Sequence, residues 1–147
     1  MALLSKNEAS LWGSWKRASE LLRARIVEEI SAETGLSDPD FGVLTRVVED
    51  GGGAMRQNQL AESMGYHRSR LSHHVTRMEE RGLVTRRQSG DGVEVVVTDE
   101  GRELVALARP IHAAAVRRYL LDPLTTDEQR ALGVVLDKLI SPKDPNR

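Results

Sequence analysis

Cysteine is absent from this chain of 147 residues. The absence excludes a disulfide framework, a thiolate nucleophile, a cysteine-held zinc or iron–sulfur site and any thiol redox sensor. Aromatic residues are scarce, so the core must be mainly aliphatic; they are Trp12, Trp15, Phe41, Tyr66 and Tyr119. No apolar run approaches the roughly 18–20 residues of a membrane span, and the first residues lack the pattern of a secretory signal. We therefore expect a soluble, cytoplasmic protein with no membrane partner.

An excess of either charge is also missing, because 21 basic residues face 22 acidic ones and the net charge is −1. Taken alone, this balance argues against a nucleic-acid partner. The charges are unevenly distributed, however. Residues 66–98 contain six arginines against four acids, residues 1–65 have a net charge of −3, and residues 99–147 are neutral. A basic segment is often only a solvated surface, so its meaning depends on the fold around it.

The first half of the chain predicts helices. Apolar residues of segment 7–34 recur at helical spacing, and Gly35 suits a left-handed helix end. Ser37 and the two aspartates that follow it are typical of a helix start. The buried face of this second helix is predicted to consist of Phe41, Leu44, Val47 and Val48. Three glycines, 51–53, end it because of their backbone entropy.

The second half predicts two short helices, a hairpin and two further helices. Residues 57–64 form a short helix closed by Gly65, and residues 68–81 form another with Leu71, Val75 and Met78 on its buried face. Strands at 83–88 and 93–97 flank a Gly-Asp-Gly turn, which is a hairpin signal. A helix at 99–121 is expected to be interrupted by a kink at Pro110, and a capping box at 125–128 opens the last helix, which ends near Ile140. Pro142 and Pro145 predict a frayed tail.

This order of elements predicts a mainly α fold with a small β-hairpin wing, namely a winged helix-turn-helix flanked by N- and C-terminal helices. We expect one domain over residues 1–147, with the winged part at 36–98 and the helical part at 1–35 and 99–147. At about 100° per residue, the side of helix 68–81 opposite Leu71 presents Ser69, Arg70, His73 and Arg77. Arginine forks, hydroxyls and positive charge suit a DNA major groove, whereas the alternative is an ordinary amphipathic surface helix.

Three stretches are similar to the MarR family of bacterial transcriptional regulators: Leu60-Ala61-Glu62, residues 68–84, and Thr98-Asp99-Glu100-Gly101. The resemblance covers nearly the whole chain. It implies an obligate homodimer held by the first and last helices, and a repressor that binds a pseudo-palindromic operator and is released by a small ligand. It also implies double-stranded DNA contacts on the fourth helix by Ser69, Arg70, Ser72, His73 and Arg77. Arg68 at the start of this helix, with Arg86 and Arg87 on the first wing strand, completes the candidate DNA-binding set.

The chain departs from the family pattern at two positions. The wing of the family usually has an Asp-x-Arg motif, but Val93 stands where its arginine is expected. The usual hydroxyl cap before the third helix is replaced by Arg56. Two interpretations of Arg56 stay open: a looser helix start, or a contact between Arg56 and a backbone phosphate.

Other kinds of site have less support. By resemblance, Trp12, Trp15, Arg23 and His112 are candidates to line a small-molecule effector site, although the tryptophans are more simply explained as dimer-interface core. No metal site is expected, because the adjacent His73 and His74 lie about 100° apart on a helix. We interpret His73 as a DNA contact and His74 as a boundary residue.

No phosphate loop, nucleophile elbow or catalytic carboxylate pair is present, so neither an enzyme nor a cofactor is expected. The leading hypothesis is a ligand-responsive, homodimeric, sequence-specific repressor. The alternative is a winged-helix protein–protein interaction module with weak or lost DNA binding.

Overall fold

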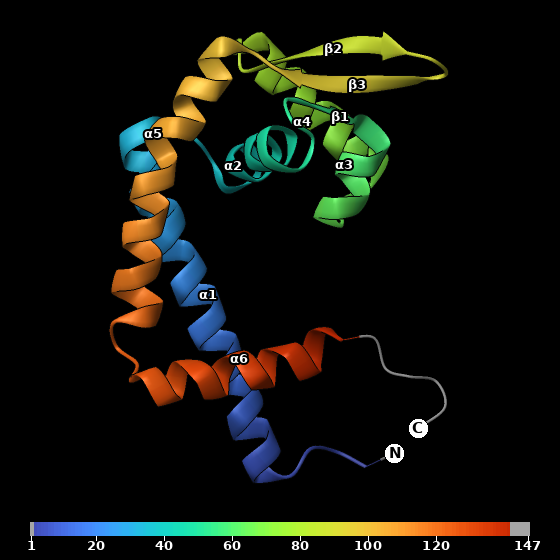
Figure 1. Cartoon of the computed structure of the whole chain (residues 1–147). Coiled ribbons are helices and arrows are strands. Elements are labelled where there is room, and N and C mark those ends of the chain that lie inside the picture. Colours follow the sequence, from blue (N-terminus) through green and yellow to red (C-terminus); the bar gives the residue numbers. More distant parts are fainter. Residues whose placement is uncertain (1, 142–147) are drawn as a thin grey trace. The chain divides into compact units, whose positions relative to one another are not determined.

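The computed structural model describes residues 2–141 (Figure 1). Its helices are α1 (Lys6–Thr34), α2 (Asp38–Thr45), α3 (Gln57–Met64), α4 (Arg68–Glu80), α5 (Asp99–Val116) and α6 (Thr126–Ile140), with π-helical turns η1 (Arg46–Asp50) and η2 (Arg117–Leu121). Its strands are β1 (Ala54–Arg56), β2 (Val84–Ser89) and β3 (Gly92–Val97). The chain divides into two compact units, one formed by residues 27–112 and the other by the flanking segments. The predicted tail at Pro142 and Pro145 lies outside the described residues.

The predicted helix ends are confirmed at the level of hydrogen bonds. The Ser37 hydroxyl accepts from the Asp40 N–H, and the Asp40 carboxylate accepts from the Ser37 N–H, which together form a capping box. Thr125 and Glu128 form a second box at the start of α6. Gly35 has φ 72°, the left-handed conformation that favours glycine at a helix end. These local signals therefore fix where the helices begin and end.

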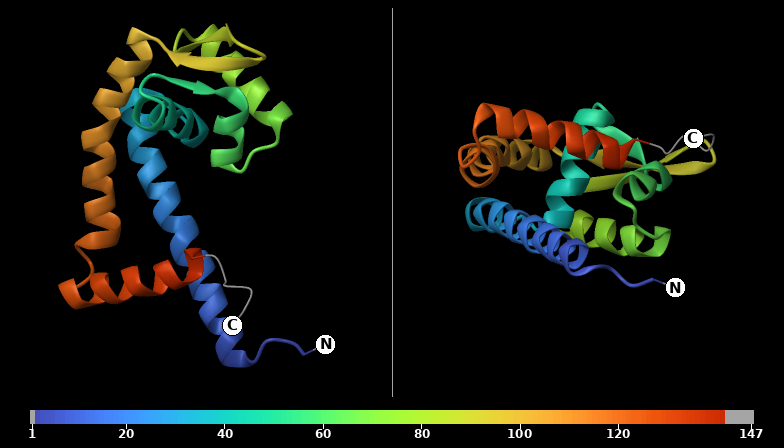
Figure 2. Two further views of the ribbon diagram at one scale, coloured as in Figure 1. Left: turned by 45° about the vertical axis from the view of Figure 1, so that its right-hand side comes forward. Right: turned by 90° about the horizontal axis from the view of Figure 1, so that it is seen from below.

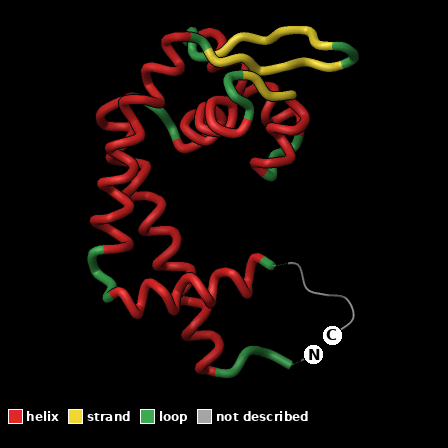
Figure 3. Tube along the Cα trace, in the orientation of Figure 1, coloured by secondary structure: helices red, strands yellow, loops and turns green. Residues whose placement is uncertain are grey.

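The sheet has three antiparallel strands in the order β1-β3-β2, so the predicted hairpin is present with one additional strand (Figure 3). β1 pairs with β3 through Met55 opposite Val95. Sequence reasoning missed β1 because it has only three residues, Ala-Met-Arg, with little strand propensity, and its partner lies 40 positions away. The pairing attaches the segment before α3 to the wing.

The hydrophobic core lies within residues 27–112, since Ala115 is the one buried apolar residue found elsewhere in the described chain. Leu71, Val75 and Met78 of α4 are buried as predicted. On the second helix Leu44 and Val47 are buried as expected, but Phe41 and Val48 are only half-buried, and the fully buried Val43 was not predicted. The wider π-helical turn from residue 46 changes the angular position of Val48, whereas Phe41 and Val43 precede it in regular α-helix.

Helix α5 does not end at Pro110, which lies inside it, and the kink expected there stays a prediction. Proline removes one backbone hydrogen bond, and a helix continues where the neighbouring bonds persist. The helical run becomes a π-helical turn at Arg117–Leu121 instead. α6 then leaves η2 at a sharp turn (Figure 2).

The unit formed by the flanking segments has many exposed apolar side chains. Those of α1 and the residues before it are Leu3, Leu4, Leu11, Trp12, Trp15 and Leu21. Those of α6 are Val134, Val135, Leu139 and Ile140. Isolated surface leucines are ordinary, whereas large groups of exposed apolar side chains are typical of interaction surfaces.

Candidate nucleic-acid interface

The turn between α3 and α4 orients the start of α4. Gly65 closes α3 with φ 65°, and His67 caps α4 by accepting the Ser69 N–H at its Nδ1. The same Nδ1 lies 2.9 Å from the Ser69 hydroxyl oxygen. The cap therefore holds both the backbone and the side chain of Ser69 at the exposed end of the helix.

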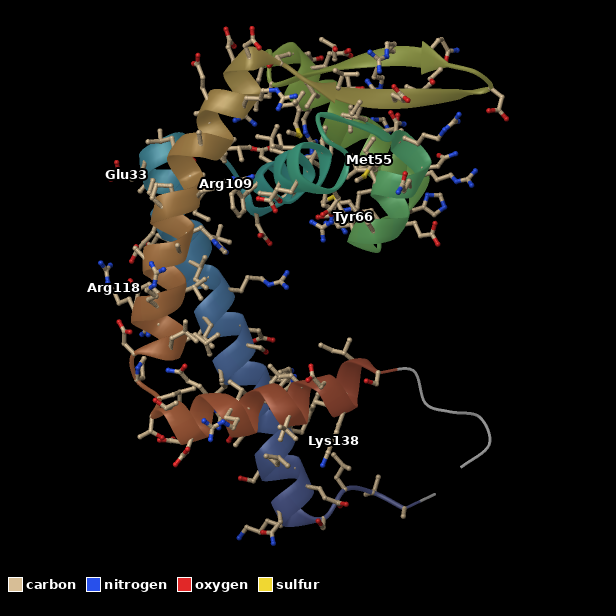
Figure 4. All side chains as sticks on the ribbon, viewed as in Figure 1. Glu33, Met55, Tyr66, Arg109, Arg118 and Lys138 are labelled. Atoms are coloured by element: carbon tan, nitrogen blue, oxygen red, sulfur yellow. The ribbon has the colours of Figure 1, made fainter. Side chains whose placement is uncertain are left out.

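The predicted polar face of α4 is exposed. Of the candidate DNA contacts, Arg68, Ser69, Arg70, His73 and Arg77 are exposed, while Ser72 is half-buried. Arg70 stacks on Tyr66, with its guanidinium carbon 3.8 Å from the centre of the ring (Figure 4 labels Tyr66). Sequence reasoning did not single out Tyr66, although an aromatic residue four positions before an arginine is a usable signal for such a contact. The stacking restricts Arg70 to one region of the surface.

A buried ionic cluster connects α2 with α4. Asp40 is 2% exposed, and its Oδ2 accepts a hydrogen bond of 2.7 Å from Arg81 Nη1. Its Oδ1 lies 3.0 Å from His74 Nε2, a close contact without hydrogen-bond geometry, and within residues 2–141 neither atom has a hydrogen-bonding partner. His74 is 8% exposed, so it is a buried residue and not the boundary residue that we expected. The two neighbouring histidines leave the helix about 100° apart, so His73 is exposed while His74 is buried.

The cluster also fixes the protonation of His74. Arg77 Nη2 lies 3.2 Å from His74 Nδ1, and because a guanidinium only donates, Nδ1 must accept and the proton stays on Nε2, facing Asp40. Burial lowers the pKa of His74, and the charges of Arg77 and Arg81 act in the same direction, which outweighs the opposing effect of Asp40. The neutral imidazole thus holds Arg77 at the exposed face of α4.

The carboxyl group of Asp40 responds in the way expected of a paired acid. Burial raises its pKa, but the hydrogen bond from Arg81, the N–H of Ser37 and the charge of Arg81 together leave the pKa below its ordinary value. Asp40 is therefore ionised at neutral pH, and its charge is neutralised mainly by Arg81.

Arg86, one of the candidate DNA contacts, has its guanidinium surrounded by acceptors within the protein. Its Nε donates to Gln57 Oε1, its Nη1 to Thr76 and Glu79, and its Nη2 to the carbonyl and hydroxyl oxygens of Ser72. The shortest of these bonds, to the Ser72 carbonyl, is 2.6 Å. A guanidinium has five N–H groups, and these contacts engage all of them. Arg86 thus ties β2 to α3 and α4.

Arg87, the next residue of the wing, is more exposed. Its Nη2 donates to Glu94 Oε2 across the strands at 2.6 Å. This hydrogen bond lowers the pKa of Glu94. Val93 is half-buried in β3 opposite Gln88, so the wing strand presents no arginine of its own at that position.

The candidate effector residues fall in different parts of the structure. Trp12 and Trp15 are 56% and 44% exposed and belong to the unit of flanking segments, together with Arg23. His112 belongs to the other unit, where its ring centre lies 5.3 Å from that of Phe41. Phe41 was not recognised as its partner from the sequence.

Residues 2–141 contain neither a cluster of metal ligands nor a helix that could span a membrane. No three His, Asp or Glu side chains there come together in a way that would ligate a metal ion. None of the helices in this part of the chain has the length and apolar character needed to cross a membrane.

The helix-turn-helix of α3 and α4, the β2–β3 hairpin and the exposed basic face of α4 together define a winged helix-turn-helix protein. A family model described as MarR family matches residues 34–92. Comparison with curated proteins found no match. AbsC, a MarR family transcriptional regulator from Streptomyces coelicolor, has a solved structure that is 30% identical, with 95% of each chain covered and a TM-score of 0.86.

Two further solved structures are similar. Sco3205, a MarR family transcriptional regulator from Streptomyces coelicolor solved in complex with DNA, is 29% identical, with 100% of this chain and 96% of that chain covered and a TM-score of 0.87. A MarR family regulator from Rhodococcus sp. RHA1 has the same fold, with 24% identity, 92% and 96% coverage and a TM-score of 0.77. The chain belongs to the MarR family of transcriptional regulators.

Proposed function

We propose that the protein is a homodimeric repressor that binds a pseudo-palindromic DNA operator and is released from it by a small-molecule effector. The observation that carries the DNA-binding part is the exposed face of α4, with Arg68, Ser69, Arg70, His73 and Arg77 beside the tight turn at Gly65. The DNA complex of Sco3205, which covers the whole of this chain, supports the same interpretation.

The side chains of this face are held before DNA arrives. Arg70 stacks on Tyr66, Arg77 contacts His74, and Ser69 contacts His67. Ordering a long side chain on binding costs roughly 0.5–1.5 kcal/mol, so contacts that already restrict these groups favour affinity. We propose Ser72 and Arg87 as additional contacts, and we assign Arg86 the role of holding α4 against the wing.

Dimerisation is proposed to occur through the helical part, residues 1–35 and 99–147, with residues 36–98 forming the DNA-binding part. The exposed apolar side chains of α1 and α6 support this arrangement, because burying such groups between two copies is favourable. Sedimentation at several concentrations should give a dimer. The double substitution Leu139→Lys and Ile140→Lys should lower the sedimentation mass toward that of a monomer. A wild-type protein that is monomeric would contradict the proposal.

DNA binding is tested by selecting duplexes from a random library with the full-length protein, followed by gel shifts. The selected sites should be inverted repeats with half-sites about 10 bp apart, since two reader helices lie about one helical turn apart. Arg70→Ala or Arg77→Ala should cost about 1–3 kcal/mol if that arginine reads a base. Arg130→Ala on α6 is a control that removes the same charge. No enrichment and no retardation at low salt would overturn DNA binding and favour the protein–protein interaction module.

The proposal also includes a cellular location and a small-molecule effector. A DNA-binding regulator acts where its DNA is, which for this family is the cytoplasm, and the proposal includes no catalytic step. Small organic ligands that release the protein from a selected duplex in a fluorescence assay should also raise its melting temperature without DNA, since a ligand stabilises the state it binds. Replacing Trp12, Trp15 or His112 should weaken that response.

A further inference from the structure

We propose that Arg56, which lies outside both the reader helix and the hairpin, is the DNA-binding cation of the wing tip and contacts a backbone phosphate. This inference rests on the proposed DNA-binding function. Arg56 is the last residue of β1 and the residue directly before α3. Its side chain forms no cap at the helix start, so the guanidinium is available elsewhere.

The guanidinium lies on the turn of the wing. Arg56 Nη1 is 3.4 Å from Asp91 Oδ1, although the two residues are 35 positions apart. A Cβ atom built on Gly92 would lie 2.5 Å from the same nitrogen, and one on Gly90 would lie 3.6 Å from Nη2. The side chain of Arg56 therefore fills the space that a residue other than glycine would need at position 92.

Charge explains why this position matters. From Arg87 to Val97 the wing contains the basic residue Arg87 and the acids Asp91 and Glu94. Arg87 and Glu94 pair with each other at 2.6 Å. Without Arg56, Asp91 would remain an uncompensated negative charge at the tip, where it would repel DNA phosphates. Arg56 removes that repulsion and adds a fork of donors.

The pair with Asp91 is easily exchanged. The Asp91 side chain is 99% exposed and that of Arg56 is 49% exposed, and ion pairs as exposed as this one contribute little to stability. A phosphate accepts a bidentate hydrogen bond from arginine at least as well as an aspartate does. Binding to DNA can therefore replace the weak internal partner with a stronger one.

Arg56 also shares a surface with the start of the reader helix. It lines one shallow depression together with Asn58, Tyr66 and Arg68. Tyr66 is the residue on which Arg70 stacks. The tip cation and the arginines of α4 thus border the same surface, as a single DNA contact requires.

The test measures the salt dependence of binding by fluorescence anisotropy, using full-length protein with a duplex selected by the wild type and with a random-sequence duplex of equal length. Loss of one phosphate contact should reduce the slope of log K against log salt by about 0.9. Arg56→Gln should show this reduction and weaken both duplexes alike, since a phosphate contact carries no sequence information. Arg56→Lys should retain most of the slope. Arg130→Gln, which removes an arginine from another exposed pair, should leave the slope unchanged.

Two further variants separate a phosphate contact from a structural role. Asp91→Asn should bind more tightly, because it removes an acid that competes with phosphate, whereas a merely structural pair predicts weaker binding. Gly92→Ala should displace the guanidinium and reduce the slope without altering any charge, with thermal unfolding checking that both variants are folded. An unchanged slope in Arg56→Gln beside a steep wild-type slope overturns this inference and leaves the proposed function intact. A wild type that binds neither duplex overturns both.

Discussion

Replacing Asp40 by asparagine tests the buried cluster that supports the reader helix. The substitution preserves the shape of the side chain but removes its charge. In the native protein Asp40 accepts from Arg81 and from the Ser37 N–H, and it faces the Nε2–H of His74. An amide presents one oxygen and one NH₂ group to these donors, so at least one of them must face another donor.

The expected cost follows from these contacts. The Arg81 side chain is 45% exposed, so the loss of its charge-assisted bond is worth about 1–2 kcal/mol after allowing for solvent. A donor left facing the new NH₂ group in a buried site adds about 1 kcal/mol or more. The total is about 2–3 kcal/mol, a large fraction of the roughly 5–15 kcal/mol that stabilises a typical protein.

Urea unfolding followed by circular dichroism at pH 7.5 measures this loss directly. All variants should be compared at one protein concentration, because dimer formation would make stability concentration-dependent. Asp38→Asn is the matched control: the same chemical change at an exposed position of the same helix turn should cost less than about 1 kcal/mol. If Asp40→Asn unfolded at the same urea concentration as the wild type, the stabilising role of the cluster would be refuted.

Three further predictions follow from the same region. Burial and the charges of Arg77 and Arg81 hold the pKa of His74 below the unfolded value of about 6.5. The contribution of His74 to stability is therefore complete above that pH and is lost as pH falls through the folded pKa. The unfolding free energies measured in urea at pH 7.5 and 5.5 should differ less in His74→Gln than in the wild type. Arg86→Lys keeps the charge but loses the forked guanidinium, so it should reduce the unfolding free energy by about 1–2 kcal/mol and leave the salt slope of DNA binding unchanged. A slope that is reduced in Arg86→Gln but not in Arg86→Lys would identify a phosphate contact instead. Tyr66→Leu should weaken DNA binding about 2- to 5-fold through the lost stacking, with no further effect when Arg70 is already alanine, and additive losses in that double-mutant cycle would contradict the stacking role.

Most helix boundaries were predictable because the physical signals are local. A hydroxyl that caps a helix, a carboxylate three residues later and a left-handed glycine all act within one turn of the chain. Ser37 with Asp40, and Thr125 with Glu128, therefore behave in the structure as their spacing indicates. The exposed face of α4 was predictable for a similar reason, since three buried residues fix the orientation of the rest of the helix.

The missed strand and the burial of His74 both concern partners that are distant in the sequence. β1 depends on pairing with a strand 40 residues later, and the burial of His74 depends on Asp40 from another helix. Arg86 was a candidate DNA contact from its place on a strand, yet two other elements, α3 and α4, supply the acceptors of its guanidinium. Periodicity describes one element at a time and carries no information about which acceptors another element will provide.

The residue order was therefore sufficient for the class of fold and for the face that α4 exposes, because helix ends and the buried side of a helix depend on interactions within about four residues. The packing of separate elements determined which arginines keep free donors. Arg86 is engaged inside the protein, Arg70 and Arg77 are held at the surface by Tyr66 and His74, and Arg56 reaches the wing tip from a segment that the sequence assigns to a helix start. A side chain's function depends on the groups that satisfy its hydrogen bonds, and for these arginines folding brings most of those groups together from distant positions in the chain.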